Sequence, residues 1–400
     1  MIRKRNLLRA LRKAFLDPMY AVTVFRKRLY SYLTYKFGKG YSAYPETVSL
    51  FLTYKCNLRC KMCGQWGENG WARKLPKEVI DNEITIERLE RLVDDLAEFK
   101  PSITLFGGEP FLYSHWEDLV CYIKSKGMRV NVITNGTILS RYVEKVVDLG
   151  VDELIFSLDG PEEIHDEMRS GKGTFNRATT SFLELDEYKK ITGKRNPKVN
   201  ISATIFEINY RRLDEVIEVA ESMNADTITF HHLIFQSPDI CAANQRVFQK
   251  EFGLNNLDWI GFARDTLPDI DTEYLINKLH ELTSRKSKVS VSVYPNYTDD
   301  EIRKYYTSFE FKSESYSPRC VSPWMTVYIF PNGDVKPCLD TCFVGGNIMR
   351  ENFREIWNSQ HYKQYQSKVN RFFTSSQGLI AAVPRMLSLT FQGCLLKMAQ

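Results

Sequence analysis

The sequence predicts an α/β fold in which six parallel strands alternate with helices, and three observations lead to this fold class. Apolar runs of four to eight residues alternate with segments of helical periodicity between residues 48 and 231. Such β–α repeats give parallel sheets with right-handed crossovers. A basic helical leader precedes the repeats, and two strand-like runs around the turn Pro331-Asn332-Gly333-Asp334 follow them as a small hairpin.

The expected strands and helices alternate along residues 48–231. Strands are expected at residues 48–52, 103–106, 129–133, 153–157, 199–206 and 227–231. Thr85 can cap the first helix, and further helical segments are expected at residues 116–126, 139–149, 182–190 and 213–223. Because sites in such folds gather at the carboxyl ends of the strands, the segments that follow the strands are the candidates for function.

Length and composition suit two domains, or one barrel with additions. The expected division is a leader (1–45), a core barrel (46–240), a connecting or substrate region (241–315), a hairpin and helix domain (316–365) and an atypical tail (366–400). No run of about 18 uncharged apolar residues occurs, so no transmembrane helix is expected. Clustered cysteines without a signal peptide indicate metal binding in a reducing compartment, and the protein is expected in the cytoplasm.

The leader is strongly basic. Residues 1–40 carry eleven Lys or Arg and one acidic residue, Asp17, whereas the remainder has more acidic than basic residues. A helical wheel separates Leu7, Leu8, Leu11 and Phe15 from Arg5, Arg9, Arg12 and Lys13. This pattern suits an anionic membrane surface, which would place the protein at the inner membrane face, or an acidic partner. A helix docked on the barrel is the alternative. No motif supports nucleic-acid binding.

Three cysteines, Cys56, Cys60 and Cys63, form a C-x3-C-x2-C motif directly after the first strand. Three thiolates on one loop can hold three corners of a [4Fe–4S] cluster, whereas ordinary ferredoxin-type clusters have four cysteine ligands. One iron is then left open for a ligand that is not protein. A zinc ribbon is the alternative, but it needs a second cysteine pair, and no cysteine follows Cys63 before Cys121.

Three further motifs follow the second, third and fourth strands: Phe106-Gly107-Gly108-Glu109-Pro110, Thr134-Asn135-Gly136 and Ser157-Leu158-Asp159-Gly160-Pro161. Together with the cysteine loop they resemble the radical SAM superfamily over residues 46–240. The resemblance implies a partial, TIM-like (β/α)6 barrel. It also implies that the open iron chelates S-adenosylmethionine, whose reductive cleavage gives a 5′-deoxyadenosyl radical that removes hydrogen from a substrate.

The resemblance also implies roles for single residues around the cofactor. Glu109, presented by Gly107 and Gly108, would meet the methionyl amino group, and Ser157 and Asp159 would meet the ribose. The other implied cofactor-binding residues are Asn135, Arg169 near the carboxylate, and Met62 beside the adenine. Ordinary turns, a solvent-facing Arg169 and a hydrophobic filler at Met62 remain alternatives.

A second group of cysteines, Cys320, Cys338 and Cys342, surrounds the hairpin. With Gly333 and the segment Glu355-Ile356-Trp357 it resembles the SPASM/twitch domain, which implies an auxiliary [4Fe–4S] cluster; zinc is the alternative. Relatives close with a C-x2-C motif, but only Cys394 follows here and is the candidate fourth ligand. A hypothesis is that the tail is a frameshift product. The codons of Met386-Leu387 encode a cysteine when they are read one nucleotide later, so the missing C-x2-C motif could lie in the shifted frame.

The combined interpretation is a radical SAM enzyme that matures a peptide and receives electrons from a reductant such as flavodoxin or ferredoxin. Dehydrogenation or modification of a sugar or small alcohol is the second interpretation. A non-catalytic iron–sulfur electron carrier is the alternative of another class. Cys121, in a helix with apolar neighbours, is expected to be a core thiol.

Overall fold

The structure, a computed structural model, describes residues 18–315 and 320–374. Within these residues a single ten-stranded sheet has the order β10-β9-β8-β1-β2-β3-β4-β5-β6-β7. All pairs from β8 through β1 to β7 are parallel, whereas β9 pairs antiparallel with both β8 and β10. The strands are β1 (Thr47–Phe51), β2 (Ser102–Phe106), β3 (Val130–Thr134), β4 (Glu153–Ser157), β5 (Lys198–Ile205), β6 (Thr227–His232), β7 (Ser290–Tyr294), β8 (Thr326–Ile329), β9 (Asp334–Lys336) and β10 (Gly346–Asn347).

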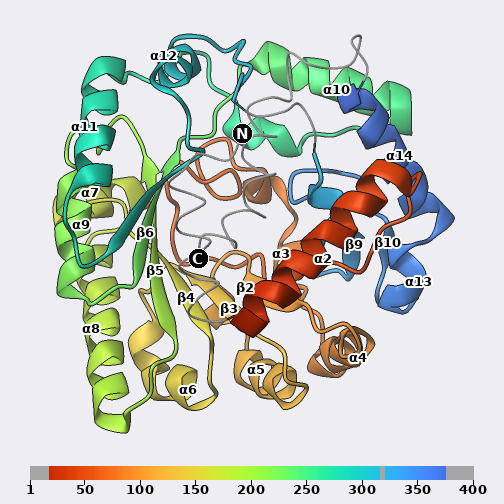
Figure 1. Ribbon diagram of the computed structural model, residues 1–400, viewed down its shortest axis with the longest axis horizontal. Helices are drawn as coiled ribbons and strands as arrows, with labels where there is room; N and C mark the ends of the chain where they lie inside the picture. The colour runs from red at the N-terminus through yellow and green to blue at the C-terminus, as the bar shows by residue number, and fades with distance from the viewer. Residues whose placement is uncertain (1–17, 316–319, 375–400) are drawn as a thin grey trace.

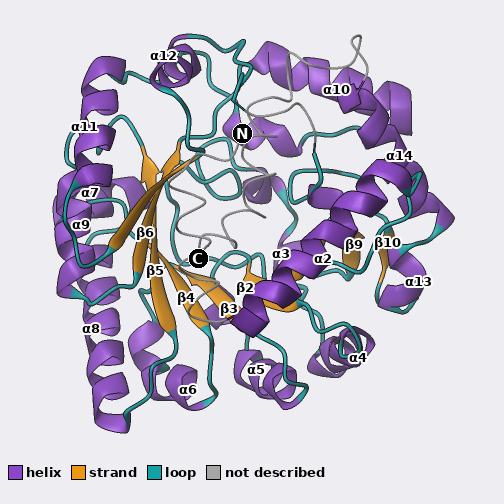
Figure 2. Cartoon of the chain, in the orientation of Figure 1, coloured by secondary structure: helices purple, strands orange, loops and turns teal. Residues whose placement is uncertain are grey.

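Helices flank the outer face of the sheet (Figures 1 and 2). The α-helices are α2 (Pro18–Phe37), α3 (Lys77–Asp81), α4 (Ile86–Leu96), α5 (Trp116–Ser125), α6 (Val143–Asp148), α7 (Glu162–Arg169), α8 (Thr174–Thr192), α9 (Leu213–Ser222), α10 (Pro238–Phe252), α11 (Thr272–Ser284), α12 (Asp299–Thr307), α13 (Phe353–Trp357) and α14 (Gln360–Thr374). Short 3-10 helices are η1 (Trp71–Lys74), η2 (Pro110–Leu112), η3 (Leu139–Arg141), η4 (Asp258–Phe262) and η5 (Ser322–Trp324).

The six strands predicted from the sequence are confirmed as β1 to β6. Successive side chains of a strand point to opposite faces of the sheet, so one set faces the helices and the other faces the inside of the barrel. In β1, Val48 and Leu50 are buried in the main hydrophobic core with Leu89 and Leu92 of α4. Ser49, between them in sequence, lies opposite Thr104 of β2 on the other face. The outer face of β1 is therefore apolar and covered by α4, whereas its inner face carries the polar Ser49 and then Phe51, which packs with Phe106 and Phe330.

Two additions extend the sheet beyond the six predicted strands. Strand β7, inside the expected connecting region, pairs with β6, and β8 of the predicted hairpin pairs in parallel with β1 in the register Val48↔Val327. The fold class is confirmed as an α/β barrel that is not closed, because β7 and β10 form the two edges of the sheet. The proposed domain boundaries remain a prediction.

Helix α2 is fixed to the barrel by polar contacts. The guanidinium of Arg28 pairs with Glu46 at 2.7 Å, and Lys27 Nζ donates to the carbonyl oxygens of Phe99 (2.9 Å) and Lys100 (2.8 Å). In the part of the chain that the structure describes, no helix has the length and apolar character needed to cross a membrane. The amphipathic segment at residues 5–15, like the tail with Cys394 and Met386, lies outside the described residues.

The expectation for Cys121 is wrong. Its side chain is exposed on α5, although Leu119, Val120 and Ile123 are buried. Apolar neighbours in sequence do not place a residue on the buried stripe of a helix, because the direction of the side chain changes by about 100° at each residue.

Candidate active site

The cysteine loop follows β1 at the carboxyl ends of the parallel strands. Cys60 is buried, and Cys56 and Cys63 are half-buried. The N–H groups of Leu58 and Trp66 donate to the sulfurs of Cys56 (3.5 Å) and Cys63 (3.4 Å). Because N–H donors stabilise thiolates, three sulfurs on one loop with these donors fit the ligands of an iron–sulfur cluster.

Burial controls the proton affinity of the loop thiols. It raises the pKa of Cys56 to about 12 and also raises the pKa of Cys60. In the described residues, no three His, Cys, Asp or Glu side chains are grouped to hold a single metal ion. A cluster bound here has to displace thiol protons, so assembly of the cluster releases protons.

Arg169, at the end of α7, connects the cysteine loop to the fourth strand. Its guanidinium pairs with the fully buried carboxylate of Asp159 at 2.6 Å, and its Nη1 donates to Cys60 Sγ at 3.7 Å. The other oxygen of Asp159 accepts the N–H of Thr204 at 2.7 Å. Asp159, expected at the ribose, is thus engaged by protein groups, and Arg169, expected at the cofactor carboxylate, contacts the sulfur of Cys60; both expected roles remain predictions.

Gly107 and Gly108 allow the loop after β2 to lie against the backbone that leads into the cysteine loop. A Cβ on Gly108 would lie 2.0 Å from the carbonyl oxygen of Lys55, and one on Gly107 would lie 2.7 Å from that of Thr53. Gly108 N–H donates to Thr53 at 2.8 Å, and Glu109 N–H donates to Lys55 at 2.9 Å. The close approach made by these glycines is therefore to protein backbone.

The carboxylate of Glu109 is buried beside the cysteine loop. It accepts hydrogen bonds from the hydroxyl of Thr134 (2.8 Å), the N–H of Asn135 (2.9 Å) and the N–H of Phe111 (3.4 Å). Burial raises the pKa of Glu109 to about 7 despite these donors. A cation beside a buried carboxylate stabilises its charged form. This environment is compatible with the role expected of Glu109 opposite an ammonium group.

Asn135 connects β3 to the cysteine loop through a residue that the sequence analysis missed. Its Nδ2 donates to Asn57 Oδ1 at 2.9 Å, and Asn57 Nδ2 donates to Thr137 Oγ1 at 2.8 Å. Thr137 Oγ1 in turn donates to Asn135 Oδ1 at 2.6 Å. Asn57 lies inside the cysteine motif, and its position directly after Cys56 was the one available signal.

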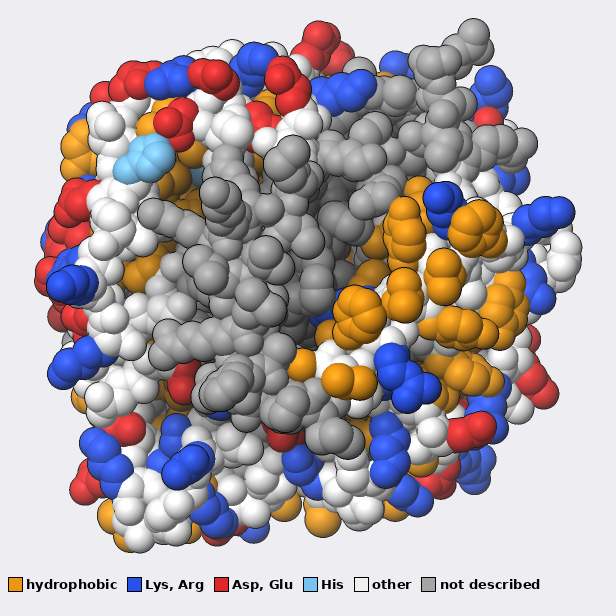
Figure 3. Space-filling model, viewed as in Figure 1, with side chains coloured by type: hydrophobic (Ala, Val, Ile, Leu, Met, Phe, Trp, Pro, Cys, Tyr) orange, Lys and Arg blue, Asp and Glu red, His pale blue; other side chains and the backbone are white. Residues whose placement is uncertain are grey.

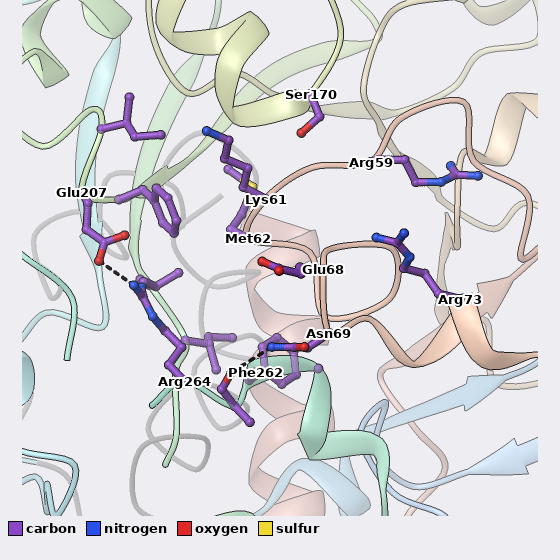
Figure 4. Close-up of a pocket in the computed structure, with 16 residues that line it drawn as sticks. Arg59, Lys61, Met62, Glu68, Asn69, Arg73, Ser170, Glu207, Phe262 and Arg264 are labelled. Atoms are coloured by element: carbon purple, nitrogen blue, oxygen red, sulfur yellow. Dashed lines mark hydrogen bonds and ion pairs between the residues drawn. The ribbon is translucent and has the colours of Figure 1, made fainter. Parts of the chain in front are cut away.

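A cavity of about 630 Å³ opens beside the cysteine loop (Figure 4). Met62 lines it, whereas Ser157 is half-buried at the end of β4 and does not line it. The charged lining residues are mostly basic, and two of the cations are paired: Arg264 with Glu207 at 2.6 Å, and Lys61 with Glu167, which lies outside the lining, at 2.7 Å. Cations in the lining are Arg59, Lys61, Arg73 and Arg264, and the anions are Glu68 and Glu207. This balance favours a substrate that carries negative charge.

Tyr365 of α14 lies near the second group of cysteines. Burial raises the pKa of its phenol most, and the charges of Cys338, Cys320 and Cys342 raise it further, so all three cysteines lie within electrostatic range of one side chain. Burial raises the pKa of Cys342 to about 11 and also raises that of Cys338. Three buried or half-buried thiols around the hairpin fit the ligands of an auxiliary cluster, and Cys394 lies outside the described residues.

A segment of the connecting region touches both groups of cysteines. Asn256 Oδ1 accepts the N–H of Cys342 at 3.1 Å, and Trp259 Nε1 donates to the carbonyl of Asp340 at 2.9 Å. Phe262 meets the cysteine loop, because a Cβ on Gly64 would lie 2.5 Å from its ring. The sequence of this segment carries no motif, but its contacts place it between the cysteine loop and the second group of cysteines.

Two family models match the chain. The radical SAM superfamily model matches residues 50–220, and the model of the SPASM iron–sulfur cluster-binding domain matches residues 320–377. The first match covers the end of β1, the cysteine loop and β2 to β5, and the second covers the hairpin cysteines.

Relatives agree with this pair of domains. The chain is 32% identical to the Fe-coproporphyrin III synthase of Methanosarcina barkeri over 46% of this chain, a match that spans only 43% of that protein. It is 24% identical to the AdoMet-dependent heme synthase of the same organism (79% of this chain, 82% of the relative). It is 22% identical to the subtilosin biosynthesis protein AlbA of Bacillus subtilis (82% and 63%).

The fold is also similar to a solved structure. SuiB of Streptococcus suis, bound to its precursor peptide SuiA, superposes with a TM-score of 0.60 at 15% identity, covering 88% of this chain and 72% of SuiB. The family matches assign an iron–sulfur cluster and S-adenosylmethionine as cofactors, as the sequence predicts. The chain therefore belongs to the radical SAM superfamily and carries a SPASM domain.

Proposed function

We propose that this protein cleaves S-adenosylmethionine reductively and uses the resulting radical to modify a peptide. When bound at Cys56, Cys60 and Cys63, the cluster and its ligand supply a 5′-deoxyadenosyl radical that removes hydrogen from the substrate. The observation that carries the proposal is that the cysteine loop itself forms a wall of the large cavity, with Arg59, Lys61 and Met62 in the lining. A substrate in this cavity would lie beside the first cluster.

The proposed tasks of the chain's own residues follow from their contacts. Arg169 orients Cys60, and the buried pair with Asp159 keeps the guanidinium in place. Glu109 is the proposed partner of the methionyl ammonium, positioned by Asn135 and by the close packing of Gly107 and Gly108. Ser157 and Asp159 remain the candidates for the ribose, and Met62 for the adenine.

The C-terminal cysteines complete the proposed set of metal ligands. Cys320, Cys338 and Cys342 are proposed to hold the auxiliary cluster, and Cys394 is proposed as its fourth ligand. A reductant such as flavodoxin or ferredoxin is the proposed electron donor, and the cytoplasm is the proposed location.

A peptide substrate is favoured by relatives that handle peptides, namely AlbA and SuiB. A second candidate is a small molecule with carboxylate groups, as the synthases of Fe-coproporphyrin III and heme among the relatives suggest. The excess of Arg and Lys in the cavity lining supports either an acidic peptide or such a carboxylate. The two differ in size and shape, so substrate addition separates them.

The test is anaerobic incubation of the reconstituted protein with S-adenosylmethionine and dithionite. We expect 5′-deoxyadenosine from the wild type and none from Cys56→Ala. Wild-type protein that contains its clusters but forms no 5′-deoxyadenosine would be an electron carrier, and the proposed activity would be wrong. Stimulation by a short peptide encoded beside the gene would favour the peptide, and stimulation by coproporphyrin III would favour the small molecule.

A further inference from the structure

Helix α2 turns polar residues toward the protein and large apolar residues toward solvent. Arg28 and Ser31 are 9% and 1% exposed, and Thr34 is buried as well. On the opposite face, Phe25 is 65% exposed and Phe37 is 67% exposed. A surface helix normally buries its apolar stripe, but in this reversed arrangement the described residues 18–315 and 320–374 leave the apolar face of α2 exposed.

The orientation of α2 is set by specific contacts with the rest of the chain. The bidentate pair of Arg28 with Glu46 holds the middle of the helix. Nearer its end, the ring of Tyr35 meets Trp324 edge-on with centroids 5.0 Å apart, and Asn370 Nδ2 donates to the Tyr35 carbonyl at 3.0 Å. These contacts keep the apolar residues pointing outward.

The exposed apolar residues form one continuous stripe at helical spacing, which we call the α2 face. It consists of Val22, Phe25, Leu29, Leu33 and Phe37, flanked by Tyr30, Tyr41 and Tyr44. Figure 3 shows hydrophobic side chains gathered over α2, with Lys and Arg side chains at the margins. A contiguous exposed patch of this kind marks an interaction site.

The charges around the α2 face point to one kind of partner. The helix contains Arg26, Lys27, Arg28 and Lys36 but no acidic residue. Lys36 Nζ lies 5.3 Å from the Phe37 ring, and Lys363 Nζ lies 5.9 Å from the Tyr41 ring. Apolar side chains bordered by tyrosines and cations are the composition of helices that lie in the plane of a membrane interface.

We propose that the α2 face docks this protein on an anionic lipid bilayer, with α2 lying parallel to the membrane surface. The apolar stripe would enter the boundary between headgroups and acyl chains, and Arg26 and Lys36 would remain at the level of the lipid phosphates. The proposal concerns residues 22–44 and does not depend on the chemistry proposed for the cavity.

Flotation of the full chain with lipid vesicles tests the proposal. We expect the wild type to float with vesicles that contain phosphatidylglycerol and to stay at the bottom with pure phosphatidylcholine. The variant Phe25→Ser/Leu29→Ser/Phe37→Ser should bind the anionic vesicles at least tenfold more weakly. Ile191→Ser, which changes an exposed apolar residue on α8, is the matched control and should bind as the wild type does.

Three results would overturn the proposal. The first is a wild-type protein that does not float with anionic vesicles, and the second is a triple variant that floats as well as the wild type. The third is a wild-type protein that binds no lipid and is a dimer, whereas the triple variant is a monomer. A second copy of the chain, and not a membrane, would then cover the α2 face. If the triple variant does not fold, Arg26→Glu/Lys36→Glu replaces it, and equal flotation of that variant would contradict the charge argument.

Discussion

Arg169 contacts Cys60, and this contact places a permanent cation beside one of the three thiols of the cysteine loop. The distance from Arg169 Nη1 to Cys60 Sγ is 3.7 Å, and the same guanidinium pairs with Asp159, whose side chain is fully buried. One arginine thus contacts both a proposed cluster ligand, Cys60, and the segment that follows the fourth strand. Removing it leaves a buried carboxylate without its partner.

We predict that Arg169→Met lowers the free energy of unfolding by about 3–5 kcal/mol, because breaking a buried ion pair leaves an uncompensated charge. Denaturant unfolding of the apo-protein measures the change. The control is Arg212→Met, which removes solvent-accessible pairs with Glu163 and Glu215 and should cost less than about 1 kcal/mol for each pair. Equal decreases in the free energy of unfolding for the two substitutions would show that the buried Arg169–Asp159 pair contributes no more to stability than an exposed pair.

Gly108→Ala should displace the cysteine loop, because the added Cβ would lie 2.0 Å from the carbonyl oxygen of Lys55. We expect the variant to retain much less iron after anaerobic reconstitution. Gly193→Ala is the control: its left-handed backbone (φ +67°) makes the alanine unfavourable, but no atom lies within 4 Å of the added Cβ. Full iron content in Gly108→Ala would mean that the loop adapts to the added methyl group.

His232 should make the protein less stable in mild acid. Burial, followed by the charge of His231, lowers the pKa of His232 to about 3, whereas an unfolded histidine titrates near its ordinary value of 6.5. Below pH 6.5 this histidine binds a proton in the unfolded state but stays neutral in the folded state. The free energy of unfolding therefore decreases as the pH is lowered. The loss from this residue between pH 7 and pH 5 is about 2 kcal/mol.

Comparison with His232→Asn isolates this effect from the many carboxylates that titrate nearby in pH. Asparagine can still reach the hydroxyl of Tyr306, which lies 2.9 Å from Nδ1 of the histidine. The variant should show a shallower loss of stability between pH 7 and pH 5 in urea unfolding. Parallel pH profiles for the two proteins would refute the assignment.

Asn256→Ala should weaken the auxiliary site and leave the first cluster intact, because Asn256 accepts the N–H of Cys342 at 3.1 Å. Protein with two [4Fe–4S] clusters holds about eight iron atoms, and we expect the variant to approach about four. Asn69→Ala, which removes an exposed contact with Ala263, serves as the control. Unchanged iron in Asn256→Ala would separate this segment from the auxiliary site.

Local patterns allowed most of the barrel to be predicted, and pairings between distant segments account for the rest. Strands β1 to β6 are short apolar runs between helical repeats, so their positions follow from sequence. Strand β7, with the sequence Ser-Val-Ser-Val-Tyr, lies among charged residues and was not recognised. The hairpin was predicted, but the pairing of β8 with β1 depends on tertiary packing that no local pattern encodes.

The candidate site divides in the same way. The cysteine motif is readable because its three residues are neighbours in sequence. The engagement of Asp159 by Arg169 and Thr204, and the link from Asn57 to Asn135, depend on how separate loops meet. The reversed face of α2 was also invisible, because a helical wheel shows an apolar stripe but not which side of the helix faces the protein.

The most direct measurement for the central claim is electron paramagnetic resonance of the anaerobically reduced protein with and without S-adenosylmethionine. The Cys320→Ala/Cys338→Ala variant removes the proposed auxiliary signal and leaves the cluster at Cys56, Cys60 and Cys63 to be observed alone. The account predicts that the g-values of this remaining cluster shift when S-adenosylmethionine is added. An unchanged spectrum from protein with verified cluster content would contradict it.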